Sequence, residues 1–131
     1  MRSFAIVAVG GAVGTLSRHG INEWLSTDHL FPAATFAVNV SGAFLLGLLL
    51  MSLTLRGGRT GSDTGTPRDL RLLLGTGFLG GFTTYSTLAV ETETLLRHDH
   101  VAMALTYGLG STVLGLIAAL GGAVTARAVS R

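Results

Sequence analysis

Long apolar stretches separated by short polar segments run along almost the whole chain. They cover residues 4–24, 34–55, 72–95 and 101–126. Two of them carry no charged residue, and in the other two the charged side chains lie toward one end. A helix needs about 20 mainly apolar residues to cross a bilayer core. The alternation of period two that marks membrane β-strands is absent. Because backbone groups in lipid need internal partners, the pattern predicts four transmembrane helices in one membrane domain, residues 1–131.

The composition narrows the class of protein further. Charged residues make up 12% of the 131 positions, whereas an average soluble domain carries about 25%. The absence of cysteine excludes disulfide scaffolds and thiolate metal sites. A net charge of +2 without a basic run argues against nucleic acid as a partner. No Ser–His–Asp set or carboxylate pair stands at a catalytic spacing, so we do not expect an enzyme.

The positive charges are unevenly distributed, and all nine are arginines. In a four-helix arrangement, seven lie on one side of the membrane and only Arg97 lies clearly on the other, with Arg18 inside the first stretch left out of the count. The seven are Arg2, Arg56, Arg59, Arg68, Arg71, Arg127 and Arg131. The positive-inside rule then predicts that both termini and the long polar loop are cytoplasmic.

The third stretch departs from ordinary helix composition. Four glycines fall between positions 75 and 81, and a run of hydroxyl side chains follows them. Glycine costs about 1 kcal/mol per residue in a helix relative to alanine, so we expect a break near Gly80 and Gly81. Broken helices in membranes supply carbonyl ligands to ions. Small residues spaced by four, such as Gly77 and Gly81, equally serve close helix packing. Both interpretations stay open from composition alone.

Polar side chains also occur inside the other three stretches. Arg18 either extends to the membrane interface or has a function within the membrane. Asn39 must be hydrogen-bonded there, either to a neighbouring helix or to a translocated anion. Tyr107 and Ser111 are four residues apart and share a helix face, which forms either a packing surface or a polar track along a pore.

Three motifs follow one another along nearly the whole chain: residues 10–14 leading to Arg18, residues 35–39 followed by Gly42, and the long run 77–87. Together they resemble the Fluc/CrcB family of fluoride channels. The resemblance implies an all-α membrane protein whose third helix is broken near its middle and which forms a dual-topology, antiparallel dimer in the cell membrane. It also implies passive fluoride efflux, which lowers cytoplasmic fluoride and protects the cell from its toxicity.

The resemblance further implies a structural sodium ion at the centre of the dimer. Its ligands would be the backbone carbonyls of Gly80 and Thr83 from both subunits. Oxygen ligands suit a hard cation of this kind. A buried cation also offsets the cost of holding anions nearby.

For the anion pathway, the resemblance points to a set of side chains on the second, third and fourth stretches, with Arg18 in an electropositive vestibule and Glu91 just beyond the third-stretch motif. Fluoride is strongly hydrated, so the pathway must replace its water with hydrogen-bond donors. The pathway residues are expected to be Asn39, Thr84, Tyr85, Ser86, Leu88, Tyr107 and Ser111.

Tyr85 and Leu88 depart from the family pattern, which usually has two phenylalanines at these positions. The edge of an aromatic ring carries a positive quadrupole, and leucine has none. The one-sided arginines also disfavour insertion in both orientations. We therefore hypothesise a heterodimer with a paralogous subunit of opposite orientation, with a homodimer as the alternative.

Two other functions compete with a fluoride channel. A small four-helix exporter of drugs or cations needs a carboxylate in mid-membrane, and Glu23 at the end of the first stretch does not meet that need. A structural membrane subunit without transport would need neither the broken third helix nor Asn39.

Overall fold

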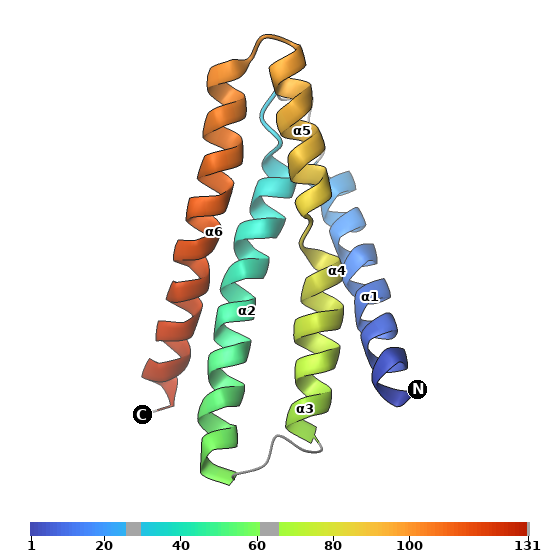
Figure 1. Ribbon diagram of the computed structural model, residues 1–131, viewed down its shortest axis with the longest axis vertical. Helices are drawn as coiled ribbons and strands as arrows, with labels where there is room; N and C mark the ends of the chain where they lie inside the picture. Colours follow the sequence, from blue (N-terminus) through green and yellow to red (C-terminus); the bar gives the residue numbers. More distant parts are fainter. Residues whose placement is uncertain (26–29, 61–65, 131) are drawn as a thin grey trace.

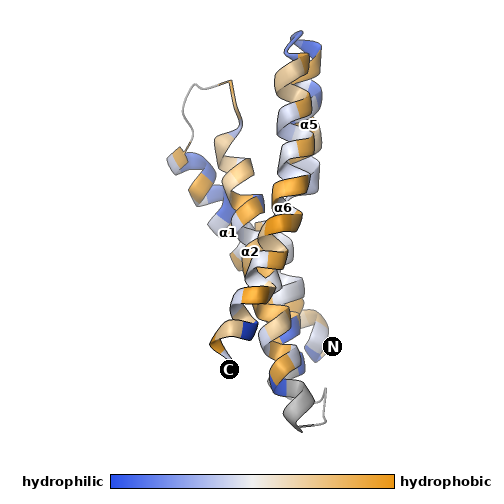
Figure 2. Ribbon diagram, turned by 90° about the vertical axis from the view of Figure 1, so that its left-hand side faces the viewer, coloured by the Kyte–Doolittle hydropathy of each residue, from blue (hydrophilic) through white to orange (hydrophobic). Residues whose placement is uncertain are grey.

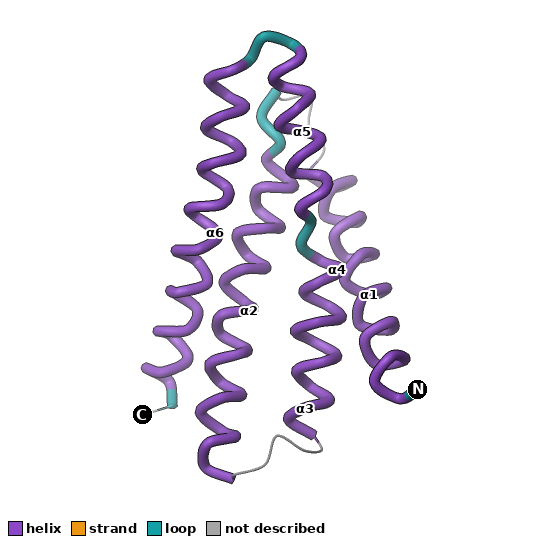
Figure 3. Tube along the Cα trace, in the orientation of Figure 1, coloured by secondary structure: helices purple, strands orange, loops and turns teal. Residues whose placement is uncertain are grey.

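The computed structural model describes residues 1–25, 30–60 and 66–130, and all the regular elements in these ranges are helices (Figure 3). They are α1 (Arg2–Leu25), α2 (Ala33–Thr60), α3 (Thr66–Leu70), the π-helix η1 (Arg71–Leu79), α4 (Gly80–Phe82), α5 (Tyr85–Arg97) and α6 (Val101–Val129). Both ends of the chain and α3 lie at one end of the molecule, and the turn between α5 and α6 lies at the other (Figure 1). An ion pair of 2.7 Å between Arg2 and Asp69 ties the start of α1 to α3.

Three helices among the described residues are long and apolar enough to cross a membrane. They are α1, the first 24 residues of α2, and α6. Hydrophobic residues run through the helices and hydrophilic ones gather toward their ends (Figure 2). The prediction of an all-helical membrane protein is thus confirmed. The predicted stretch 72–95 is divided among η1, α4 and α5, so no single long helix spans it.

The backbone of this third segment leaves the helical region later than expected. Gly80 and Gly81 both lie within α4, and the departure from helix comes two residues after Gly81, near the position that the glycines indicate. The extended residues are Thr83, with ψ of 156°, and Thr84, with φ of −145° and ψ of 122°. The nine residues before α4, Arg71–Leu79, form a π-helix, a rare conformation that is frequent at functional sites.

Glycines bring the backbone of α1 against η1 and α4. A Cβ atom added at Gly14 would stand 2.0 Å from the carbonyl oxygen of Phe78. One added at Gly81 would stand 2.3 Å from the carbonyl oxygen of Gly11. These distances are far too short for any side chain, so the packing interpretation holds for Gly81. Gly80 differs, because a Cβ atom there would meet nothing within 4 Å.

A second glycine contact joins α2 to α6. A Cβ atom added at Gly47 would lie 2.0 Å from the carbonyl oxygen of Ala119, and one at Gly122 would lie 2.1 Å from that of Phe44. Side-chain cores are small by comparison: one surrounds Val38, Leu79 and Phe82, and the other Leu95, Ala104 and Tyr107. Much of the outer surface is apolar, including Leu109, which is 65% exposed. Such a surface suits lipid or another subunit.

Candidate functional site

The extended residues after α4 are held by a side chain from α2. The N–H of Thr84 donates to Oδ1 of Asn39 at 2.8 Å, and Nδ2 of Asn39 donates to the carbonyl of Thr84 at 2.9 Å. The Oδ1 of Asn39 therefore takes the place of the Gly80 carbonyl, to which the Thr84 N–H would donate in a continuous helix, and the Nδ2 gives the Thr84 carbonyl a further donor. This pairing explains why the chain departs from helix at Thr83 and Thr84 rather than at the glycines before them.

This pairing and the cap of α5 redirect the N–H groups that would normally serve two carbonyls. In a continuous α-helix, the Gly80 carbonyl would accept from Thr84, whose N–H is bonded to Asn39. The Thr83 carbonyl would accept from Thr87, whose N–H donates at 3.2 Å to Oγ1 of Thr84, the N-cap of α5. Two carbonyls close together in sequence thus lack their helical donors, and Gly80 is exposed. Backbone oxygens of this kind fit the hard sodium ion that the family resemblance implies.

A cavity of about 350 Å³ adjoins these carbonyls. Residues from α2, η1, α4, α5 and α6 line it, so it lies where the second, third and fourth predicted membrane stretches come together. Its polar lining includes Asn39, Gly80, Thr83, Thr84, Tyr85, Ser111 and Thr112. The structure thereby brings together most of the residues that the sequence assigned to the pathway.

Ser111 presents a donor without a protein acceptor at this cavity. The residue is only 5% exposed, and within the described part of the chain its Oγ has no hydrogen-bond partner. A buried hydroxyl that is left unsatisfied costs free energy, which a small polar ligand or water would recover. Tyr107 lies one helical turn away on the same face of α6 and is fully buried.

Beyond Ser111, polar side chains from two other helices bond to Glu91 on α5. Thr35 Oγ1 on α2 donates to Oε1 of Glu91 at 2.9 Å, and the Tyr107 hydroxyl on α6 donates to Oε2 at 2.5 Å. Thr35 is 2% exposed; it begins the motif 35–39, but it was assigned no role from the sequence. Its position four residues before Asn39 on the same helix face is a signal that would have identified it.

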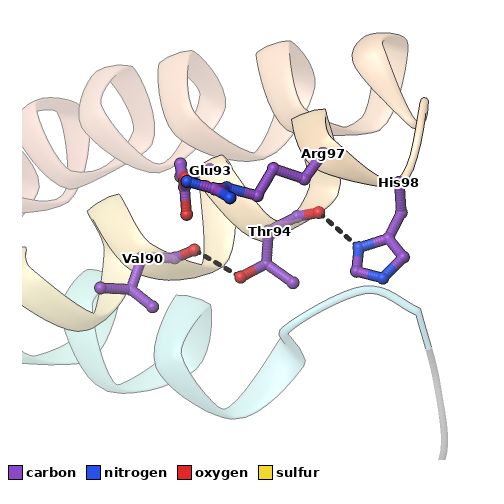
Figure 4. Close-up of polar contacts among 5 residues, drawn as sticks. All are labelled: Val90, Glu93, Thr94, Arg97 and His98. Atoms are coloured by element: carbon purple, nitrogen blue, oxygen red, sulfur yellow. Dashed lines mark hydrogen bonds and ion pairs between the residues drawn. The ribbon is translucent and has the colours of Figure 1, made fainter.

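Glu91 also lines a second pocket, of about 360 Å³, on the side of the α5–α6 turn. Its other polar residues are Thr94, His98 and His100. In Figure 4, Thr94 Oγ1 donates to the carbonyl of Val90, and Nδ1 of His98 lies 2.8 Å from the carbonyl of Thr94. Glu93 and Arg97 form a separate ion pair one turn apart on α5. Ser111, Tyr107 and Glu91 therefore form a polar line from the first cavity to this second pocket.

The remaining predicted residues lie at the edge of this arrangement or outside it. Tyr85 is 83% exposed at the rim of the first cavity, and Leu88, partly buried, lines the cavity one turn later. Ser86 is exposed, with its Oγ 3.3 Å from Oγ1 of Thr84. Arg18 is partly exposed on α1 and is not among the lining residues of either pocket. The single chain thus joins Ser111, Tyr107 and Glu91 but does not bring Arg18 to them.

Comparison with known proteins identifies the family. Residues 5–123 match the model of the family described as CrcB-like protein, Camphor Resistance (CrcB). The chain is 43% identical over 128 residues to fluoride-specific ion channel FluC 2 of Leifsonia xyli subsp. xyli, covering 98% of this chain and 86% of the relative. It is 44% identical over 128 residues to a fluoride-specific ion channel FluC of Thermus thermophilus, covering 92% of this chain and 94% of the relative. The expected resemblance is confirmed, and the chain belongs to the CrcB family.

Proposed function

We propose that this protein is a subunit of a fluoride-specific ion channel, and not an enzyme. Two relatives that carry this name match the chain over 86% and 94% of their own length. In this role it lets fluoride leave the cell passively, which lowers cytoplasmic fluoride and protects against its toxicity. The arginine distribution favours cytoplasmic termini, and the cell membrane is the site at which such efflux has this effect.

One observation carries the proposal most directly: the buried Oγ of Ser111 at the first cavity. A dehydrated fluoride ion needs hydrogen-bond donors to replace its water. Ser111 offers a donor that no described protein group uses, and the Tyr107 hydroxyl, next along α6, would serve the ion by exchanging its bond to Glu91 for one to fluoride. Movement along this line exchanges one donor for the next without leaving the ion bare in a low-dielectric region.

We propose further that two such subunits form an antiparallel dimer around a structural sodium ion. The carbonyls of Gly80 and Thr83 would be its ligands, because the N–H groups that they would meet in a helix are engaged elsewhere. Bound there, the ion would offset negative charge near the pathway. The exposed apolar side chains of the single chain support burial against a partner as well as lipid.

The partner in this dimer is proposed to be a paralogous subunit of opposite orientation. Tyr85 and Leu88 at the cavity leave one of the two expected aromatic ring edges absent, and a different subunit can supply it. A homodimer is the alternative. Expression of this chain alone in liposomes separates the two, because robust fluoride flux without a partner would rule out the heterodimer.

The channel itself is tested by fluoride efflux from liposomes that hold either fluoride or chloride, with the dimer reconstituted in sodium. We expect fluoride to pass and chloride to be excluded. Ser111→Ala should slow fluoride efflux by about tenfold or more, because a hydrogen bond to a charged group contributes about 1.5–3 kcal/mol. Thr125→Val is the matched control on α6, because its hydroxyl bonds only to the carbonyl of Gly121. Equal passage of chloride, or an unchanged rate in Ser111→Ala, would contradict the proposal.

A further inference from the structure

The amide of Asn39 is occupied by the backbone of one residue. Its Oδ1 accepts from the N–H of Thr84, and its Nδ2 donates to the carbonyl of the same residue, at 2.8 and 2.9 Å. The two residues are 45 positions apart in sequence and lie on different elements. Thr84 is buried and Asn39 is partly buried, so these bonds are partly shielded from water. Such a two-point contact fixes the position of the backbone and of the amide together.

This contact has a direct consequence for the carbonyl of Gly80. If the N–H of Thr84 were released from Asn39, the chain could continue as a helix and direct that N–H at the Gly80 carbonyl. Gly80 already has helical φ and ψ of −66° and −34°, so its carbonyl would then accept that N–H and its lone pair would be engaged. The pairing with Asn39 prevents this, because one N–H cannot serve both acceptors at full strength.

We infer that Asn39 is a positioning residue for the cation site, acting through the backbone of Thr84 to keep the carbonyls of Gly80 and Thr83 available as ligands. This inference rests on the proposed sodium site. It differs from the expectation that Asn39 serves as an anion donor, because the oxygen and one N–H of the amide are already used. Asn39 thereby couples α2 to cation affinity.

The test compares sodium binding by wild type and Asn39→Ala in the purified, detergent-solubilised assembly. Thermal unfolding is followed as N-methylglucamine chloride is replaced by sodium chloride at constant ionic strength. The sodium concentration at half-maximal stabilisation should rise by about tenfold or more in Asn39→Ala, because two buried hydrogen bonds that favour the liganded backbone are lost. Thr54→Val is the control on α2, since its hydroxyl bonds only to the carbonyl of Leu50.

A second readout distinguishes positioning from a direct contact with the anion. If Asn39 acts through the cation site, high sodium should restore much of the fluoride flux that Asn39→Ala loses at low sodium. Flux that stays low at every sodium concentration, together with an unchanged sodium midpoint, would overturn the inference and assign Asn39 to the anion alone.

Hydrogen exchange in the wild type decides the matter if Asn39→Ala does not fold. Coupling is reciprocal, so sodium should slow exchange of the Thr84 amide when Asn39 and the cation cooperate. Exchange at Thr84 that is unaffected by sodium, while sodium still stabilises the protein, would refute the inference. If sodium stabilises neither the wild type nor the control, the cation site itself is wrong, and fluoride selectivity still tests the channel separately.

Discussion

Glu91 is the residue whose surroundings depend most on other parts of the chain. Both carboxylate oxygens accept a hydrogen bond, one from Thr35 and one from Tyr107. A carboxylate within a membrane-spanning bundle is costly unless it is bonded, so these donors keep it in place. In this position, Glu91 extends the line of polar side chains from Ser111 and Tyr107 to the second pocket, which it also lines.

Replacing Tyr107 by phenylalanine tests this arrangement at a single atom. The ring keeps its packing against Phe31, whose centroid is 5.6 Å away, while the bond to Glu91 is lost. We expect fluoride efflux to fall by about tenfold or more, since a bond to a charged group contributes about 1.5–3 kcal/mol. Thr106→Val, which removes a neighbouring exposed hydroxyl, should keep the wild-type rate. A wild-type rate in Tyr107→Phe would place the hydroxyl outside the pathway.

Leu88 offers the opposite test, a gain of function. Leu88→Phe places an aromatic ring edge at the first cavity, and an edge carries positive charge density that favours an anion. We expect fluoride efflux by the reconstituted dimer to rise about threefold to tenfold, in line with about 0.5–1.5 kcal/mol for an aromatic contact. Leu109→Phe on the exposed surface of α6 should have no such effect. A fall in flux would mean that leucine at this position is required by the pore.

At the scale of elements, glycine contacts decide which helices lie together. The backbone of α1 lies directly against η1 and α4, and that of α2 against α6. Apolar side chains gain little from association within lipid, so close backbone packing supplies much of the attraction. The same contacts keep Gly80 on the opposite side from α1, which leaves its carbonyl near the cavity.

Two alanine substitutions on α1 distinguish the effect of a close backbone contact on stability from the effect of helix propensity. Gly14→Ala forces a Cβ atom against the Phe78 backbone, so the free energy of unfolding should fall by about 1–3 kcal/mol or more. Gly20→Ala meets nothing within 4 Å and should raise it by up to about 1 kcal/mol. Thermal or chemical unfolding in detergent measures both. Equal changes in the free energy of unfolding in the two variants would exclude the close contact between α1 and the backbone of Phe78.

At the scale of the whole molecule, the distribution of the arginines over the two ends of the helix bundle bears on its orientation in the membrane. The chain ends and α3 lie at one end of the helices, where Arg2 and Arg68 also lie, and Arg97 lies beside the turn at the other (Figure 1). From this difference, the positive-inside rule predicts a single orientation in the membrane. A chain with one orientation cannot by itself form an antiparallel dimer, which is why a partner of opposite orientation belongs to the proposal.

Cysteine labelling measures the orientation directly, because the natural chain contains no cysteine. We expect Ser130→Cys to react with a membrane-impermeant maleimide only after the cells are opened. His100→Cys, in the turn at the other end, should react in intact cells. Labelling of each variant from both sides in similar amounts would establish dual topology and remove the argument for a heterodimer.

The sequence alone determined the class of protein and most of its helices. Length and hydropathy set three membrane helices close to their observed bounds, because crossing a bilayer leaves few alternatives to a long apolar helix. The motifs likewise identified the family and named Asn39, Tyr107, Ser111 and Glu91 as residues of interest.

Only the tertiary structure decided how those residues are used. Composition indicated a break near Gly80 and Gly81 and left close packing open, and the structure uses Gly81 for contact with α1 and places the extended residues at Thr83 and Thr84. The reason is a side chain 45 residues away: Asn39 offers Thr84 better-placed partners than the helix does. Likewise the sequence around Thr35 does not indicate its partner, because the hydrogen bond to Glu91 forms only when α2 and α5 lie together. Local propensity is a property of neighbours in sequence, whereas these hydrogen bonds depend on neighbours in space.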